Sequence, residues 1–327
     1  MKDYILYYDS GTSNTRAYLL DRDFQVRYTV KKAVGSKDSA IAGSNRVLIE
    51  GLWELYNSVL SANALEEGDI SAIYASGMIT CAYGLKEVPH LALPLTVEEL
   101  AGGLVPFLEG TLFHRELVLV PGLKTVHDDI TFVNNMRGEE IEIVGALDEL
   151  QSMGAPHDLA LILPGSHTHV TCLQGEQITG IISNFTGELF HAIQKETILS
   201  PVLQWDGSPP DRAMVLKGYE NLEKFGFNRA LYICRAMDAF GEGTPAQRFS
   251  YGEGVILGGV RQSLEYYCRN FWPGCRTAAL VSDEFMYQLF SILLEDSPCI
   301  DQVLWLPISE GKSYGVNGLK KILSRRQ

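Results

Sequence analysis

Hydrophobic and polar positions along this chain follow two patterns, short apolar runs and longer stretches with apolar residues at helical spacing. The short runs predict buried strands at 4–8, 17–20, 70–75, 117–120, 159–163, 170–173, 276–281 and 303–306. Apolar residues alternating with charged ones predict one more strand over 24–34. The helical spacing predicts helices over 45–65, from about 134 to 150, over 187–199, 213–225, 228–240, 249–267 and 315–326, and from about 282. Because strands and helices alternate, we expect an α/β fold.

The first two predicted strands flank the turn Asp9-Ser10-Gly11-Thr12-Ser13-Asn14-Thr15-Arg16. Gly11 lets backbone amides approach a ligand closely, the hydroxyl and amide side chains add neutral donors, and Arg16 adds a cation. Asp9 is a candidate ligand for a magnesium ion, directly or through water. This composition is typical of a phosphate-binding hairpin, although the same residues also favour an ordinary tight turn.

A second pair of predicted strands flanks Pro164-Gly165-Ser166-His167-Thr168-His169. Aligning Gly11 with Gly165 without gaps places Thr12 over Ser166. The match indicates a duplicated unit with two facing hairpins, and chance similarity between two strand-turn-strand segments is the alternative. Small residues and a proline at 152–156 predict a boundary, which gives domains of 1–154 and 155–327.

Composition and charge exclude several classes of protein. The 327 residues, 46% apolar and 20% charged, predict a soluble globular protein of two domains. The formal net charge of −13 argues against general affinity for nucleic acid. Apolar runs are too short for a membrane span or a signal peptide, so we expect a cytoplasmic protein. Six scattered cysteines without a Cys-x-x-Cys pair are expected to be reduced and structural.

Two facing phosphate-binding hairpins around a cleft predict phosphoryl transfer, in which the protein positions groups and neutralises charge. Transfer to a sugar-type hydroxyl also needs a carboxylate that accepts its proton. Asp128 and Asp129 are the candidates because they follow a strand at its loop-facing end, and helix capping is their alternative role. An acidic substrate needs a cation, for which Lys86 and Arg137 are candidates unless they are solvated surface charges.

Zinc and serine chemistry are set aside. His127, His167 and His169 do not have the spacing of a zinc site. Ser166 lacks the Gly-x-Ser-x-Gly context of a hydrolase nucleophile.

Several motifs, in one order over the first two thirds of the chain, resemble those of the 2-dehydro-3-deoxygalactonokinases, members of the actin-like superfamily that includes acetate and sugar kinases. They are the Asp9–Arg16 turn, Ser76-Gly77-Met78-Ile79 with 84–89, Pro121-Gly122-Leu123 through His127-Asp128-Asp129, Met136-Arg137-Gly138-Glu139-Glu140, 163–167 and Thr186-Gly187-Glu188-Leu189.

The resemblance implies two ribonuclease H-like domains with the actin-like ATPase fold on either side of a central cleft, the last helix packing back on the first domain. It implies magnesium-dependent transfer of the ATP γ-phosphoryl group to the 6-hydroxyl of 2-dehydro-3-deoxy-D-galactonate, or a related sugar acid, in galactonate catabolism. The implied partners are the sugar acid and ATP, with neither nucleic acid nor membrane, and a homodimer is compatible with the family.

Site residues are implied in the same way, by position in the matching motifs. Phosphates would be held by Asp9, Gly11, Thr12, Asn14, Arg16, Gly165, Ser166 and His167, with Asp9 also holding the metal. The sugar acid would contact Ser76, Met78, Lys86, Arg137 and Glu139, and Asp128 or Asp129 would be the general base.

The last third of the chain departs from the family pattern around the adenosine. Ala279-Leu280-Val281-Ser282-Asp283-Glu284 has two carboxylates where relatives have a glycine-containing strand end. His169 stands where relatives tend to have lysine, and Pro307-Ile308-Ser309-Glu310-Gly311 is also altered. We hypothesise an active kinase with a displaced adenine or an altered substrate. The alternatives are a non-catalytic sensor of a sugar acid or nucleotide and, with weaker support, an ester hydrolase.

Overall fold

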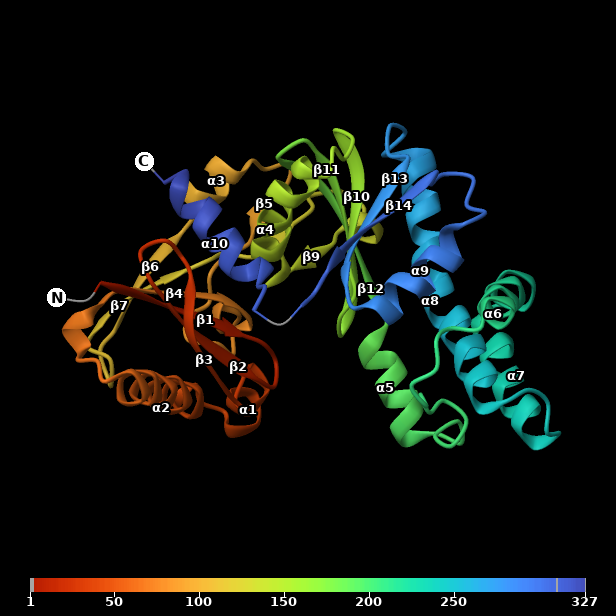
Figure 1. Cartoon of the computed structure of the whole chain (residues 1–327), viewed down its shortest axis with the longest axis horizontal. Coiled ribbons are helices and arrows are strands. Elements are labelled where there is room, and N and C mark those ends of the chain that lie inside the picture. Colours follow the sequence, from red (N-terminus) through yellow and green to blue (C-terminus); the bar gives the residue numbers. More distant parts are fainter. Residues whose placement is uncertain (1–2, 310, 327) are drawn as a thin grey trace. The chain divides into compact units, whose positions relative to one another are not determined.

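The computed structural model describes residues 3–309 and 311–326, which form two compact units (Figure 1). Unit 1 contains the chain up to Met153, the short segment Glu176–Ile178 and the C-terminal segment. Unit 2 contains Gly154–Gly175 and Thr179–Ser309. The last helix, α10 (Tyr314–Ser324), therefore belongs to unit 1 although it follows unit 2 in the chain.

Unit 1 is built on a six-stranded sheet with the order β3-β2-β1-β4-β7-β6. Its strands are β1 (Tyr4–Ser10), β2 (Thr15–Leu20), β3 (Val26–Lys32), β4 (Ile70–Gly77), β6 (Val105–Glu109) and β7 (Arg115–Leu119). Strand β1 pairs antiparallel with β2 and parallel with β4. The carboxyl ends of β1 and β4 consequently meet at one edge of the sheet, beside the turn that joins β1 to β2.

Helices cover both faces of this sheet. Because side chains alternate along a strand, Leu6 and Tyr8 of β1 face the core beneath α2 (Arg46–Asn63). Tyr7 faces the other way, toward α10, where a Cβ placed on Gly315 would lie 3.1 Å from the tyrosine oxygen. Helix α10 packs against α4 (Glu139–Ser152). The shorter helices are α1 (Ser36–Ala42), α3 (Val97–Gly102) and the 3₁₀ turns η1 (Glu67–Asp69), η2 (Met78–Thr80) and η3 (Ile130–Phe132).

A small sheet, ordered β5-β8-β9, precedes α4. It consists of β5 (Leu91–Ala92), β8 (Leu123–Lys124) and β9 (Asn135–Met136). The helix predicted from about 134 to 150 is present as α4, but its predicted start is wrong, because Met136 pairs with Leu123 and Gly138 adopts φ 118° before the helix begins. A positive φ is available to glycine without strain, so Gly138 turns the chain from strand into helix.

Unit 2 contains a five-stranded sheet with the order β12-β11-β10-β13-β14. Its strands are β10 (Asp158–Leu163), β11 (His167–Gln174), β12 (Gln177–Phe185), β13 (Thr277–Ser282) and β14 (Gln302–Pro307). Its helices are α5 (Gly187–Glu196), α6 (Arg212–Phe225), α7 (Phe227–Ala239), α8 (Pro245–Asn270) and α9 (Glu284–Leu294). Apolar residues from the sheet and from α6 to α9 share one core.

The two units share a strand order. In each, the first strand pairs antiparallel with the second strand and parallel with a strand that follows a helical crossover. The predicted α/β fold is confirmed, and the common order is what a duplicated unit predicts.

All six cysteines are free thiols, and all except the half-buried Cys81 are buried. Within residues 3–309 and 311–326, no helix has the length and apolar character needed to cross a membrane.

Candidate active site

Three carbonyl groups of the turn between β1 and β2, those of Gly11, Thr12 and Asn14, accept backbone hydrogen bonds. The Gly11 amide closes the turn by donating to the Asn14 carbonyl at 2.8 Å. The carbonyl of Gly11 accepts from the Ser36 amide at 3.3 Å, and that of Thr12 accepts from the Lys37 amide at 2.9 Å. A phosphate is repelled by carbonyl oxygens and attracted by N–H groups, so this arrangement suits an anion.

Gly35 permits the two hydrogen bonds from Ser36 and Lys37 to the turn, which is called the clasped turn below. A Cβ at this position would lie 2.4 Å from the Thr12 carbonyl oxygen, so only glycine lets the start of α1 reach the turn. Sequence reasoning missed Gly35 and Lys37, because a contact between residues 11–12 and 35–37 leaves no local pattern.

Asp9 lies at the carboxyl end of β1, directly opposite Arg16 on β2 and Ser76 on β4. Burial raises the pKa of Asp9 above its ordinary value, and the charge of Arg16 opposes that rise. Ser76 is fully buried, and its hydroxyl hydrogen-bonds the Tyr7 hydroxyl at 2.7 Å. The structure therefore brings Asp9, Arg16 and Ser76 together. The Ser76 side chain is buried beneath the site, with its hydroxyl bonded to Tyr7.

The start of α4 adds carboxylates beside Asp9. A Cβ on Gly138 would lie 3.3 Å from the Gly77 Cα, which places the helix start over the end of β4. Burial raises the pKa of Glu139, and the charge of Asp9 adds to the rise. Burial, followed by the charges of Asp9 and Glu139, raises the pKa of Glu142 to about 8. Asp9, Glu139 and Glu142 thus form an acidic cluster on one face of unit 1.

Glu142 was not predicted, although its spacing of three residues from Glu139 on a helix is a usable signal. The neighbouring Glu140 is fully buried, and burial raises its pKa to about 8, with the charge of Glu139 adding. One Glu140 oxygen accepts from the Gly138 amide at 2.6 Å, so this residue secures the start of the helix.

Arg137 braces the loop between β4 and β5. Its guanidinium donates to the Thr80 hydroxyl at 2.6 Å and to the Val88 carbonyl at 2.9 Å. Met78, at the start of this loop, is half-buried, and Lys86 is exposed. The residues predicted to bind the sugar acid therefore differ in how freely they can contact a ligand. Arg137 already donates hydrogen bonds to protein groups, whereas the Lys86 side chain is open to solvent.

The second hairpin lies against the start of α5 in unit 2. Gly165 and Gly187 are so close that a Cβ on Gly187 would lie 2.3 Å from the Gly165 carbonyl oxygen. The Glu188 amide donates to the Ser166 carbonyl at 2.8 Å, and Glu188 lies 3.6 Å from His167. The hairpin thus has one carbonyl occupied by an amide, as in unit 1, and its exposed Gly165, Ser166 and His167 remain accessible.

Comparison with known proteins decides the family. The sequence profile described as 2-keto-3-deoxy-galactonokinase matches residues 9–304, which is most of the chain. The chain belongs to this family. It is 30% identical over 192 residues to a probable 2-dehydro-3-deoxygalactonokinase of Rhizobium meliloti, covering 59% of this chain and 56% of the relative. It is 26% identical over 200 residues to the 2-dehydro-3-deoxygalactonokinase of Escherichia coli, covering 60% of this chain and 62% of the relative. The matched part thus spans less than two thirds of each curated relative.

Solved structures agree on the fold. A Sinorhizobium meliloti protein assigned as a 2-dehydro-3-deoxygalactonokinase superposes with a TM-score of 0.73 at 21% identity, covering 98% of this chain and 95% of that one. Acetate kinase of Porphyromonas gingivalis superposes with a TM-score of 0.51 at 9% identity, covering 99% of this chain and all of that one. At these identities the comparison shows the actin-like kinase fold expected for the family.

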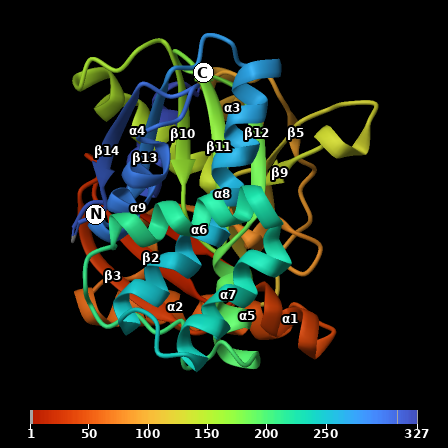
Figure 2. The same ribbon diagram turned by 90° about the vertical axis from the view of Figure 1, so that its right-hand side faces the viewer.

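Asp128 and Asp129, the base candidates suggested by the family motifs, lie in the connection between β8 and β9. Both are exposed, and the segment 125–134 projects from the body of its unit (Figure 2). The Asp129 carboxylate accepts from the Thr131 amide at 2.9 Å, and this bond lowers its pKa. The structure does not bring either residue into the acidic cluster at Asp9.

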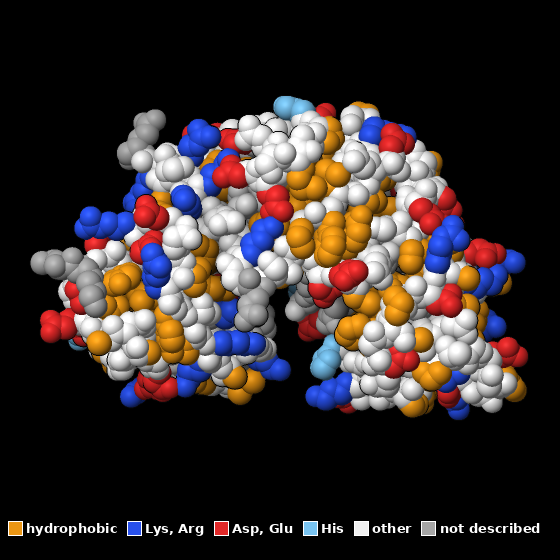
Figure 3. All heavy atoms as spheres, viewed as in Figure 1, with side chains coloured by type: hydrophobic (Ala, Val, Ile, Leu, Met, Phe, Trp, Pro, Cys, Tyr) orange, Lys and Arg blue, Asp and Glu red, His pale blue; other side chains and the backbone are white. Residues whose placement is uncertain are grey.

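The segment 279–284, where the family resemblance implies the adenosine, leads from β13 into helix α9. Asp283 caps the helix by accepting from the Met286 amide at 2.9 Å, and Glu284 is exposed. Trp305 of β14 donates to the Ser282 carbonyl at 3.1 Å and stacks on Tyr287. Figure 3 shows apolar side chains gathered on the viewed face of unit 2 near β14. Asp283 therefore has a structural role as the cap of α9, whereas Glu310 of the altered late loop lies outside the described residues.

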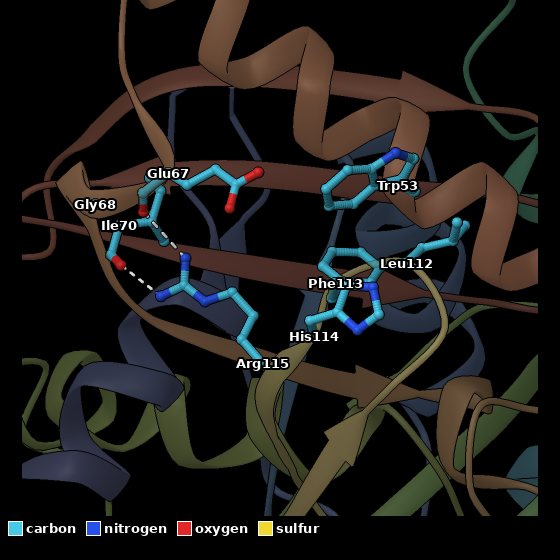
Figure 4. Close-up of a pocket in the computed structure, with 8 residues that line it drawn as sticks. All are labelled: Trp53, Glu67, Gly68, Ile70, Leu112, Phe113, His114 and Arg115. Atoms are coloured by element: carbon cyan, nitrogen blue, oxygen red, sulfur yellow. Dashed lines mark hydrogen bonds between the residues drawn. The ribbon is translucent and has the colours of Figure 1, made fainter.

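A pocket of about 580 Å³ lies at the opposite end of the unit 1 sheet, where β4 and β7 begin (Figure 4). Trp53 and Phe113 form its apolar side. Arg115 donates to the Tyr56 hydroxyl and to the carbonyls of Glu67 and Ile70, so its guanidinium is already satisfied. The pocket is separate from the Asp9 cluster, which lies at the other end of β4.

Proposed function

We propose that this protein transfers the γ-phosphoryl group of ATP to the 6-hydroxyl of 2-dehydro-3-deoxy-D-galactonate or a related sugar acid. The observation that carries the proposal is the turn at 9–16 beside Asp9, in which the carbonyls of Gly11, Thr12 and Asn14 already accept backbone hydrogen bonds. Family membership supplies the reaction class, since the matched relatives are named 2-dehydro-3-deoxygalactonokinases.

In this reaction the turn amides and Arg16 bind phosphate oxygens, and Gly165, Ser166 and His167 contribute the second phosphate-binding turn. Within residues 3–309 and 311–326 no group of three or more His, Cys, Asp or Glu side chains is placed to hold a metal ion, so a magnesium ion here would rest on Asp9 as its protein ligand. Asp9 would hold the ion together with water and phosphate oxygens, and the ion would supply neutralisation of charge on the transferred group.

The acceptor side of the site comprises Met78, Lys86 and the start of α4. Lys86 is the exposed cation that can pair with the acceptor carboxylate, and Arg137 acts by holding the loop that carries it. The departures near 282–284 are compatible with an adenine held away from the strand end, because that end is occupied by the α9 cap.

The test is a coupled ADP-release screen over aldonates and 2-keto-3-deoxy-aldonates with ATP and magnesium. We expect turnover that depends on the acceptor and is highest with a six-carbon 2-keto-3-deoxy acid. Binding of sugar acid or nucleotide without turnover would instead support the sensor alternative. Release of phosphate without any acceptor would support the hydrolase alternative.

The identity of the general base gives a separate prediction. Asp128 and Asp129 stay the sequence-based candidates, and Glu139 is a further candidate because its carboxylate is close enough to Asp9 for that charge to add to the rise of its pKa. We expect Glu139→Gln to lower kcat by about 10²–10⁴-fold, as loss of a general base does, and Asp128→Asn or Asp129→Asn to change it by less than about fivefold. Single-turnover phosphorylation measures the effect, with acceptor binding as the folding control. The reverse pattern would assign the base to the 128–129 segment.

A further inference from the structure

Lys37 lies beside the phosphate-binding turn but outside the motif that identifies it. Its backbone amide donates to the Thr12 carbonyl at 2.9 Å, so the backbone of Lys37 lies in direct contact with the turn. A lysine side chain reaches roughly 6 Å from its Cα, far enough to place the ammonium group over the turn amides. Its side chain is exposed and therefore free to adopt that position.

The charges around Lys37 leave its ammonium group available. Among the described residues, Lys37 forms no ion pair, whereas Lys32 of the neighbouring strand pairs with Glu54. The adjacent Asp38 carboxylate accepts from the Gly35 amide at 2.8 Å, which directs it toward the start of α1.

The site has a need for such a cation. Arg16 is the only cation within the 9–16 turn, and it lies directly opposite Asp9. Lys31 of β3 lies directly opposite Arg16, so two cations are already present at this edge of the sheet. A nucleoside triphosphate carries more negative charge than these two balance, and a further cation at the rim of the turn strengthens its binding.

We propose that Lys37 binds a phosphate oxygen of the nucleotide through its ammonium group. The inference rests on the proposed function, because it takes ATP as the ligand of the turn. The side chain acts as a point charge that contributes to nucleotide affinity, and its contribution scales with the charge of the ligand.

The experiment compares Lys37→Gln, Lys37→Arg and a matched control, Lys32→Gln, in the full chain. Lys32→Gln removes the same charge five residues earlier, from a side chain paired with α2. Calorimetric titration with magnesium ATP and with adenosine measures the two affinities at low and high salt. We expect Lys37→Gln to raise the Kd for ATP about tenfold and to weaken its salt dependence, with the adenosine Kd unchanged. Lys37→Arg restores most of the affinity, and Lys32→Gln changes it less than about twofold.

Unchanged ATP affinity in Lys37→Gln, with normal binding by the wild-type protein, would overturn the role of Lys37 and leave the proposed function standing. Equal losses for ATP and adenosine would also overturn it, since they indicate a disturbed turn rather than a lost charge. Absence of ATP binding by the wild-type protein would overturn both proposals.

Discussion

The Asp9→Asn variant is expected to lose about a thousandfold in kcat/KM for phosphoryl transfer while remaining folded. Asp9 is the carboxylate at the carboxyl end of β1, opposite Arg16 and beside the clasped turn. Asparagine preserves the shape of the side chain but removes the charge that would hold a metal ion against the phosphates. The ADP-release assay at saturating acceptor measures the loss, and Asp23→Asn, an exposed carboxylate in the loop after β2, is the matched control.

The same variant should not lose stability at neutral pH. Because burial raises the pKa of Asp9, the folded chain binds this proton more tightly than the unfolded chain does. Wild-type stability therefore falls as pH rises from the ordinary aspartate range through the raised pKa, and an uncharged asparagine avoids that fall. We expect the urea midpoint of Asp9→Asn to equal or exceed that of the wild type at pH 7.5, with the difference shrinking as pH is lowered. A clear loss of stability would show that Asp9 is a structural carboxylate and not a functional one.

Gly318→Ala is expected to destabilise unit 1 by about 3 kcal/mol. Helices α4 and α10 cross so closely that a Cβ on Gly318 would lie 1.8 Å from the Ile141 carbonyl oxygen, and one on Gly145 would lie 1.9 Å from that of Tyr314. Backbone atoms cannot move aside as a flexible side chain can, so the helices must separate. Urea unfolding followed by circular dichroism measures the effect.

Gly259→Ala is the matched control for this helix crossing. Gly259 lies in the interior of α8, and a Cβ there would meet no atom within 4 Å. Because alanine is a better helix former than glycine, this change should stabilise the protein by about 0.5–1 kcal/mol. Equal effects of the two substitutions would mean that helix propensity, and not the crossing of α4 and α10, determines the outcome.

Much of the fold was predictable from local pattern. Alternating or uninterrupted apolar runs located β1, β4, β10 and β13, because a buried strand needs apolar side chains whatever it packs against. The beginning of α4 was misplaced, because the apolar spacing continues through Met136, a buried strand residue. Only the pairing of Met136 with Leu123 and the positive φ of Gly138 separate strand from helix there.

The amino-acid sequence by itself determined the α/β architecture, the two glycine turns at 11 and 165 and the family, since these depend on residue types at short spacing. The tertiary structure decided which groups serve those turns. Gly35 and Lys37 reach the first turn through a contact across more than twenty residues, and Glu139 and Glu142 reach Asp9 from a helix far along the chain. Such groups are brought together by packing, whose free energy depends on the whole core. A local pattern of residues therefore does not predict which distant groups will meet.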